Sequence, residues 1–152
     1  MANSHSVPCL LPGGLSVDDR GQLTFVQGFN FANVRRFYVV ENFSTSVVRA
    51  FHGHRREEKY VFALTGSAIV AAVELADVSH PDPNSKPFRF VLSARSPGIL
   101  HIPAGFANGF RALEQRTRLL FFSSATLEDS VKDDYRFKYD QWGTDVWKSE
   151  NR

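Results

Sequence analysis

The chain has 152 residues, with 18 basic and 16 acidic side chains, so its formal net charge is only +2. That length predicts one domain, and the near-neutral net charge does not indicate the basic surface that nucleic-acid binding needs. No run of about 18 apolar residues is present to span a membrane, and the first residues lack a signal-peptide pattern. The single cysteine, Cys9, cannot form an internal disulfide, which fits a reducing compartment. We therefore expect a cytoplasmic protein without nucleic-acid or membrane partners.

Taken in order, the chain alternates short β patterns with turns. Residues 1–14 predict a loosely held arm or an edge strand. Apolar or alternating runs follow at residues 22–26, 36–40, 47–52, 60–64, 68–75, 88–92, 98–102, 109–113 and 118–122. The runs 60–64 and 68–75 flank Thr65-Gly66-Ser67 and predict a hairpin. Residues 79–87, with three prolines, predict a loop, and residues 126–152 predict a short helical or irregular tail packed on the body.

Roughly nine or ten short strands, with turns every 8–12 residues, are typical of an all-β antiparallel sandwich or small barrel. A small barrel can hold one ligand in its mouth. The whole chain, residues 1–152, is therefore expected to be a single domain of this class.

The candidate chemistry lies in His52-Gly53-His54. On a strand these two histidines share one face, because side chains alternate. Arg49, three residues before His52, falls on the opposite face unless a bulge re-aims it. Two neighbouring imidazoles can bind a metal or move protons near neutral pH. Alternatively, they are ordinary surface histidines.

Several short segments together resemble one group of proteins, over residues 15–142. The resemblance is to the cupin, or jelly-roll, nucleotide-sugar isomerases, both the dTDP-4-dehydrorhamnose 3,5-epimerases and the dTDP-sugar 3,4-ketoisomerases. It implies a cupin fold with the tail packed on the barrel. The segments that carry it are Asp19-Arg20-Gly21, Arg49-Ala50-Phe51-His52, His52-Gly53-His54-Arg55, Ile102-Pro103-Ala104-Gly105-Phe106-Ala107-Asn108-Gly109-Phe110 and Asp133-Asp134-Tyr135.

The resemblance assigns roles to several residues. It implies that His52 is the base, that His54 is its partner, and that Lys59 lies beside the sugar. Arg49 or Lys59 would stabilise the developing oxyanion. In the tail, Tyr135 is a candidate acid and Tyr139 a candidate contact for the nucleotide. The remaining expected substrate-binding residues are Arg20, which approaches the phosphates, Asn108 and His101, although His101 equally fits a satisfied core histidine.

The chain departs from the epimerase pattern at three positions. Asn108 stands where the epimerases have a histidine, and Ala50 replaces a glycine. Phe121 stands where counting from Phe110 places the catalytic tyrosine, so the usual acid is missing. These departures favour ketoisomerisation by the histidine pair over double epimerisation.

The expected activity is therefore isomerisation of a nucleotide-linked 4-keto-6-deoxy sugar, with dTDP as the expected nucleotide, in deoxysugar or surface-polysaccharide biosynthesis. A neutral imidazole would remove a proton next to the ketone. One alternative is a metal-dependent cupin that uses His52, His54 and Glu58. Asn108 interrupts the second half of that ligand set, so we expect no metal or other cofactor. Another alternative is a non-catalytic sugar-binding cupin. Unpaired strand edges favour a homodimer.

Overall fold

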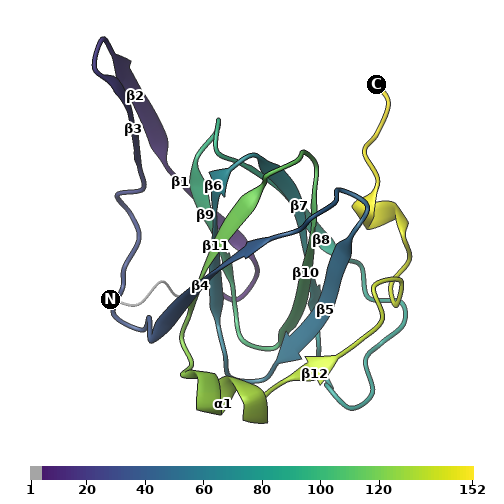
Figure 1. Ribbon diagram of the computed structural model, residues 1–152. Coiled ribbons are helices and arrows are strands. Elements are labelled where there is room, and N and C mark those ends of the chain that lie inside the picture. Colours follow the sequence, from purple (N-terminus) through teal and green to yellow (C-terminus); the bar gives the residue numbers. More distant parts are fainter. Residues whose placement is uncertain (1–4) are drawn as a thin grey trace.

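The computed structural model describes residues 5–152, which are almost entirely β structure (Figure 1). Its strands are β1 (Cys9–Pro12), β2 (Gly14–Asp18), β3 (Gly21–Phe25), β4 (Arg36–Glu41), β5 (Val48–His54), β6 (Lys59–Thr65), β7 (Ser67–Glu74), β8 (Phe88–Ser93), β9 (Gly98–Ile102), β10 (Phe106–Ala112), β11 (Arg118–Ser123) and β12 (Tyr135–Arg136). The helices are α1 (Leu127–Lys132) and the 3₁₀ turn η1 (Asp145–Trp147).

Two five-stranded antiparallel sheets face each other and enclose the core (Figure 1). One has the order β1-β9-β6-β11-β4 and the other β12-β5-β10-β7-β8. The apolar side chains between them include Val61, Leu100, Phe110 and Leu119. This arrangement confirms the expected antiparallel jelly roll with little helix.

The predicted hairpin of residues 60–64 and 68–75 is wrong. β6 and β7 belong to different sheets, and the chain crosses between them at Gly66, whose φ is +72°. Residues Ser67–Val73 are all buried, so β7 is covered on both of its faces. A turn signal reveals a chain reversal, but it does not reveal which strands pair across it.

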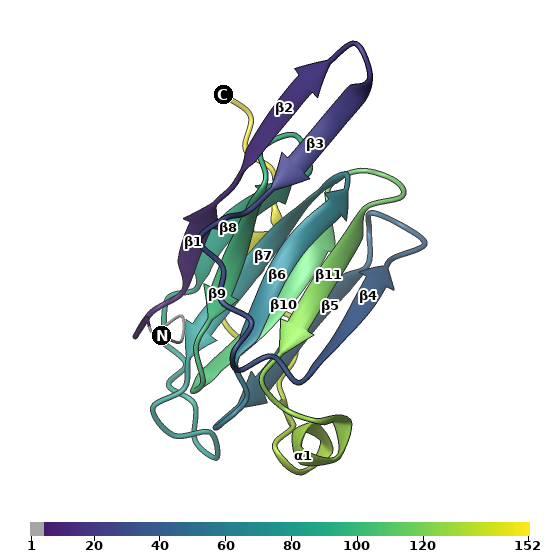
Figure 2. The same ribbon diagram turned by 90° about the vertical axis from the view of Figure 1, so that its left-hand side faces the viewer.

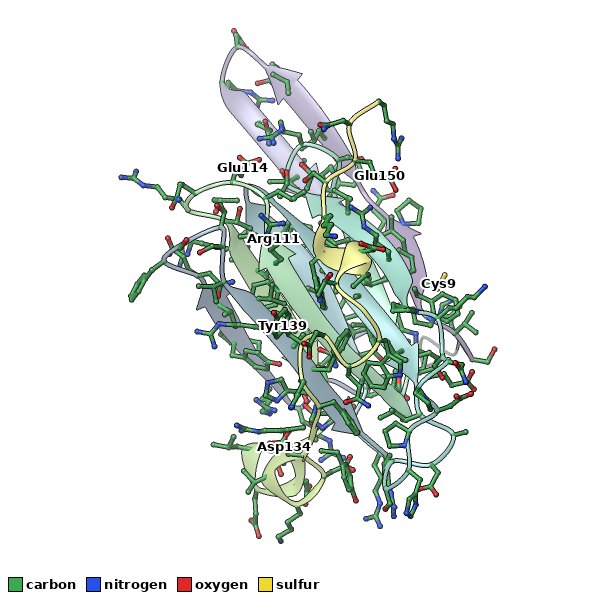
Figure 3. The ribbon with its side chains drawn as sticks, turned by 90° about the vertical axis from the view of Figure 1, so that its right-hand side faces the viewer. Cys9, Arg111, Glu114, Asp134, Tyr139 and Glu150 are labelled. Carbon is green, nitrogen blue, oxygen red and sulfur yellow. The ribbon has the colours of Figure 1, made fainter. Side chains whose placement is uncertain are left out.

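The C-terminal tail crosses the outer surface of the sheet that contains β5 and β10 (Figure 3). Phe51 contacts the rings of Trp142 and Trp147, and these aromatic side chains belong to a second apolar cluster beneath the tail. Arg111 fixes the tail by donating a hydrogen bond of 2.6 Å to the carbonyl of Trp147. At the lower end of the barrel in Figure 1 lies α1, which Thr126 caps by accepting from the Asp129 amide.

Strands β2 and β3 form a separate hairpin that projects beyond the barrel (Figure 2). Val17 is 71% exposed and Leu23 is 64% exposed on it. A two-stranded hairpin is only marginally stable when isolated in water. Within residues 5–152, the helices are all too short or too polar to cross a membrane.

Candidate functional site

A cavity of about 180 Å³ lies between the two sheets, lined by β4, β6 and β11 of one sheet and by β5 and β10 of the other. Three of the titratable residues that the sequence predicts for the site line this cavity: Arg49, His52 and Lys59. Asn108 lines it as well and donates from Nδ2 to the carbonyl of His52 over 3.3 Å. The other lining residues are Tyr38, Val40, Gly109, Phe110 and Phe121.

A bulge brings Arg49 to the same cavity as His52. His52 pairs with Asn108 and Arg49 pairs with Phe110, so three steps along β5 match two steps along β10. The extra residue shifts the alternation of side chains by one position. Arg49 is then held by its Nε, which donates to Oδ1 of Asn42 over 2.7 Å.

The bulge depends on glycine at position 109. A side chain there would collide with the backbone and side chain of Ala50. We expect Gly109→Ala to lower the free energy of unfolding by roughly 1–3 kcal/mol, the usual cost of overpacking. Urea denaturation measures this change. Gly28→Ala is the matched control, because an added methyl group there meets no atom within 4 Å. Equal stability of the two variants would contradict this account of the bulge.

His52 is paired with a carboxylate from the tail. Its Nδ1 lies 3.3 Å from Oδ1 of Asp134, whose other oxygen accepts from Nε of Arg136. Burial alone would raise the pKa of Asp134, but the hydrogen bonds from Arg136 and His52 outweigh it and lower that pKa. Asp134 is therefore an anion that can orient the His52 ring and leave Nε2 as the proton acceptor.

Lys59 and Tyr38 supply the other polar groups of the cavity. Lys59 is 8% exposed, and its Nζ lies 5.9 Å from the centre of the Tyr38 ring. Burial lowers the pKa of Lys59, and the charge of Glu57 opposes that shift. Burial also raises the pKa of Tyr38 well above its ordinary value, so the phenol keeps its proton.

His54 shares a face with His52, since Gly53 between them faces Leu75 and Phe137 on the outer side. It lies outside the lining of the cavity and is 3% exposed. Its Nδ1 lies 2.7 Å from the carbonyl of Asp133. Burial lowers the pKa of His54, so this imidazole is neutral at pH 7.

His101 and Glu58 lie on the other side of their sheet, so the structure corrects two expectations. His101 pairs with Tyr60, which follows Lys59 in β6 and therefore points to the face opposite the cavity. Nε2 of His101 lies 2.8 Å from Oε2 of Glu58. His101 is thus a satisfied buried histidine that stacks on Tyr60, and it does not line the cavity. Glu58 cannot complete a metal site with His52 and His54. Residues 5–152 contain no cluster of three or more potential metal-binding side chains.

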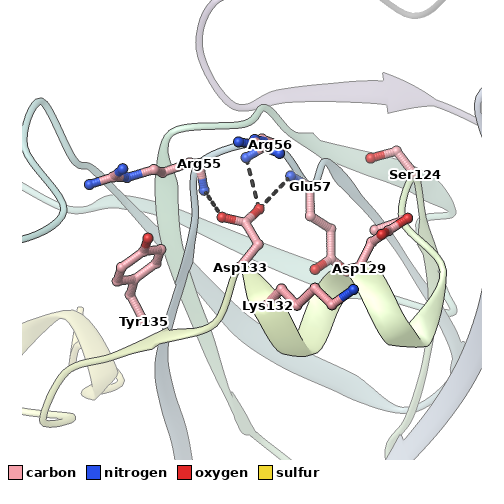
Figure 4. Close-up of a pocket in the computed structure, with 9 residues that line it drawn as sticks. Arg55, Arg56, Glu57, Ser124, Asp129, Lys132, Asp133 and Tyr135 are labelled. Carbon is pink, nitrogen blue, oxygen red and sulfur yellow. Dashed lines mark hydrogen bonds between the residues drawn. The ribbon is translucent and has the colours of Figure 1, made fainter.

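The tyrosines of the tail also lie outside the cavity, contrary to expectation. Tyr135 pairs with Gly53 and packs under the guanidinium of Arg55, on the wall of a polar hollow beside α1 (Figure 4). Tyr139 is 49% exposed on the tail (Figure 3). Tyr135 lies on β12, the edge strand that pairs with β5, and packs against the apolar cluster beneath the tail.

Arg20 lies at the turn of the β2–β3 hairpin and forms its ion pair with Asp18. Its side chain is 86% exposed, and it is absent from the cavity lining. Within one chain, therefore, Arg20 does not meet the other candidate residues.

Residues 17–147 match the family model of dTDP-4-dehydrorhamnose 3,5-epimerase. The chain belongs to the dTDP-4-dehydrorhamnose 3,5-epimerase family. A curated relative, the spore coat polysaccharide biosynthesis protein SpsL of Bacillus subtilis, is 27% identical over 95 residues. That match spans 62% of each chain, so this chain covers about three fifths of the length of SpsL.

Solved structures of similar fold include both reaction types. The RmlC epimerase of Mycobacterium tuberculosis gives a TM-score of 0.75 at 18% identity, covering 95% of this chain and 78% of that one. The QdtA 3,4-ketoisomerase of Thermoanaerobacterium thermosaccharolyticum, as a double mutant in complex with TDP, gives 0.66 at 20% identity, covering 92% and 94%. At these identities the likeness confirms the fold alone.

For a member of this epimerase family, the cavity reveals one candidate that the sequence analysis missed. Tyr38 pairs with Phe121 across β4 and β11, and the two rings stack 5.1 Å apart at an angle of 3°. A phenol thus lies beside the position where the epimerases carry a tyrosine. Alternation along β4 predicts that Tyr38 and Val40 share a face. Only the pairing of β4 with β11 shows that Tyr38 lies against Phe121.

Proposed function

We propose that this protein isomerises a nucleotide-linked 4-keto-6-deoxy sugar by proton transfer next to the ketone. The observation that carries the proposal is the His52–Asp134 pair at a cavity shared with Tyr38, Lys59 and Arg49. An oriented base, a phenol and two cations are the groups that enolisation of a ketone needs. The family match and the two kinds of structural neighbour support the same reaction class.

In the proposed reaction, Nε2 of His52 takes the proton from the carbon beside the ketone. The electrons of that C–H bond form the enolate, and Lys59 and Arg49 stabilise the negative oxygen. Tyr38 donates a proton as the intermediate is reprotonated. Return of a proton to the original carbon from the opposite face gives an epimer. For the 3,4-ketoisomer, the enolate oxygen first takes a proton to give an enediol. The neighbouring hydroxyl then loses its proton, and the old carbonyl carbon gains one.

We favour ketoisomerisation. This reaction needs a second base for the hydroxyl proton, and the second histidine of the pair is the candidate for that role. His54 is neutral and buried, and lies on the same face as His52. Phe121 removes the acid that the epimerases use on β11. Epimerisation remains the second candidate, supported by the family whose model the chain matches.

The test is to incubate the protein with dTDP-4-keto-6-deoxyglucose in heavy water, with a chelator present and no metal added. The expected product is a 3-keto sugar with deuterium at C4. Deuterium at C3 or C5 with the 4-ketone retained would identify an epimerase. If the folded protein neither converts the substrate nor exchanges its protons, the proposal fails and a non-catalytic sugar-binding role replaces it.

We further propose that the protein works in the cytoplasm as a homodimer. The cavity is smaller than the ~300–1,000 Å³ of typical ligand sites, so it holds only the sugar of a nucleotide sugar. The diphosphate and base need a further wall. A second copy supplies one if the projecting hairpin packs on it and carries Arg20 to the partner's cavity mouth. The exposed apolar residues of the unpaired edge strand β4, Phe37 and Val39, extend this contact surface.

Light scattering tests the assembly. We expect a particle of twice the 17.1 kDa chain mass. Phe37→Glu, which places a charge on an exposed apolar side chain of β4, is expected to shift the protein towards monomers. Val131→Glu on α1 is the matched control, since Val131 is also exposed, at 70% against 68%. A monomeric wild type, or equal dissociation in both variants, would contradict the proposed contact.

A further inference from the structure

Glu57 is a fully buried carboxylate beside His54, and its side chain has no exposed surface. It lies in the turn between β5 and β6. Its Oε1 accepts from Arg36 Nη2 at 3.1 Å and from Ser123 Oγ at 2.6 Å. Its Oε2 accepts from Ser130 Oγ at 2.7 Å and lies 3.2 Å from His54 Nδ1. Side chains from β4, β5, β11 and α1 thus converge on one carboxylate.

These contacts determine which nitrogen of His54 carries the proton. Nδ1 faces two groups that can only accept a hydrogen bond, the Asp133 carbonyl and the Glu57 carboxylate. A neutral imidazole in that position carries its proton on Nδ1. Nε2 then keeps a free lone pair, and this buried atom has no hydrogen-bond partner within residues 5–152. His54 is therefore held in the form that accepts a proton at Nε2.

Glu57 also balances the charges around the cavity. The charged groups that act on His54, Lys59 or Glu57 are Arg36 from β4, Lys59 from β6, and Asp133 and Asp134 after α1. Burial favours the neutral form of Lys59, and Glu57 provides the largest opposing charge. Burial of a carboxylate carries a desolvation penalty, and apolar side chains of similar volume would join the four elements at least as stably. A role in the reaction gives a reason for keeping it.

We propose that Glu57 is a positioning residue for the isomerisation: through Nδ1 it holds His54 in the form whose Nε2 can accept a proton. This inference rests on the proposed function. It concerns a residue that does not line the cavity and that acts through His54.

Glu57→Gln tests the proposal, because it preserves size and removes the charge. In the wild type, ¹⁵N NMR of the imidazole is expected to show His54 protonated at Nδ1. In the variant, the signals are expected to show a loss of the single tautomer, since the Gln amide can donate as well as accept. We expect kcat to fall about 10–100-fold, as for other errors in positioning, with an unchanged Kd for TDP.

Ser130→Ala is the matched control. It removes one hydrogen bond from the same carboxylate but keeps its charge and its contact with His54, so kcat is expected to stay within about twofold of the wild type. If Glu57→Gln does not fold, Glu57→Asp is measured in the same way, since a shorter side chain withdraws the carboxylate from His54. A folded variant that retains wild-type turnover and the wild-type tautomer would overturn the inference. The NMR result stands apart from turnover, so a wild type without isomerase activity refutes the proposed function while the tautomer still reports on Glu57.

Discussion

His52→Asn is expected to lower kcat by about 10²–10⁴-fold, the usual contribution of a general base. Asparagine retains a polar side chain of similar reach but has no titrating nitrogen. His52 lines the cavity with its side chain 40% exposed, so the replacement disturbs little packing. The Kd for a nucleoside diphosphate, measured by calorimetry, is expected to stay unchanged, because the proposed role of His52 lies at the sugar.

Exchange of substrate protons with heavy water separates the base from the other groups. If His52 abstracts the proton, exchange is lost together with turnover. His54→Asn is expected to cost about as much in a ketoisomerase and less in an epimerase. His80→Asn is the control, since that exposed histidine pairs only with the neighbouring Asp77 among the described residues. Circular dichroism verifies the fold. A folded His52→Asn protein with wild-type turnover and exchange would refute the assignment.

Tyr38→Phe is expected to lower kcat by a similar factor of about 10²–10⁴, because it removes the proposed proton donor and keeps the ring. The ring packs face to face with Phe121, so its stacking survives the loss of the hydroxyl group. Burial raises the pKa of Tyr38, and the wild-type phenol therefore remains protonated across the range in which enzymes are assayed. Steady-state kinetics with the keto sugar measures the effect.

A second variant tests whether the phenol is needed in this part of the cavity. In Tyr38→Phe with Phe121→Tyr, the hydroxyl moves to the neighbouring strand, where the epimerases carry their tyrosine. We expect a partial recovery of turnover, with deuterium from heavy water appearing at C3 or C5. Tyr38→Phe leaves no hydroxyl group on that ring. Unchanged kcat in this single variant would therefore exclude Tyr38 as the acid.

The sequence by itself predicted the β character and the motif that carries the site. Runs of apolar and aromatic residues located β4, β8 and β11 within one residue, because such side chains fit the pleated, half-buried surface of a strand. His52-Gly53-His54 also revealed that two imidazoles share a face, since that depends only on neighbours within one strand. Both inferences use local geometry, which a sequence contains.

Only the tertiary structure decided which faces and strands meet. Alternation predicts that His101 and its sequence neighbours point to opposite faces of the sheet, but it does not show which face borders the cavity. The pairing of His101 with Tyr60 shows that His101 lies on the face away from the cavity. The β-bulge opposite Gly109 turned Arg49 inward, and the β4–β11 register brought Tyr38 to Phe121. These outcomes depend on contacts between residues far apart in the chain. Their energies come from packing and hydrogen bonding across strands, which local pattern does not encode.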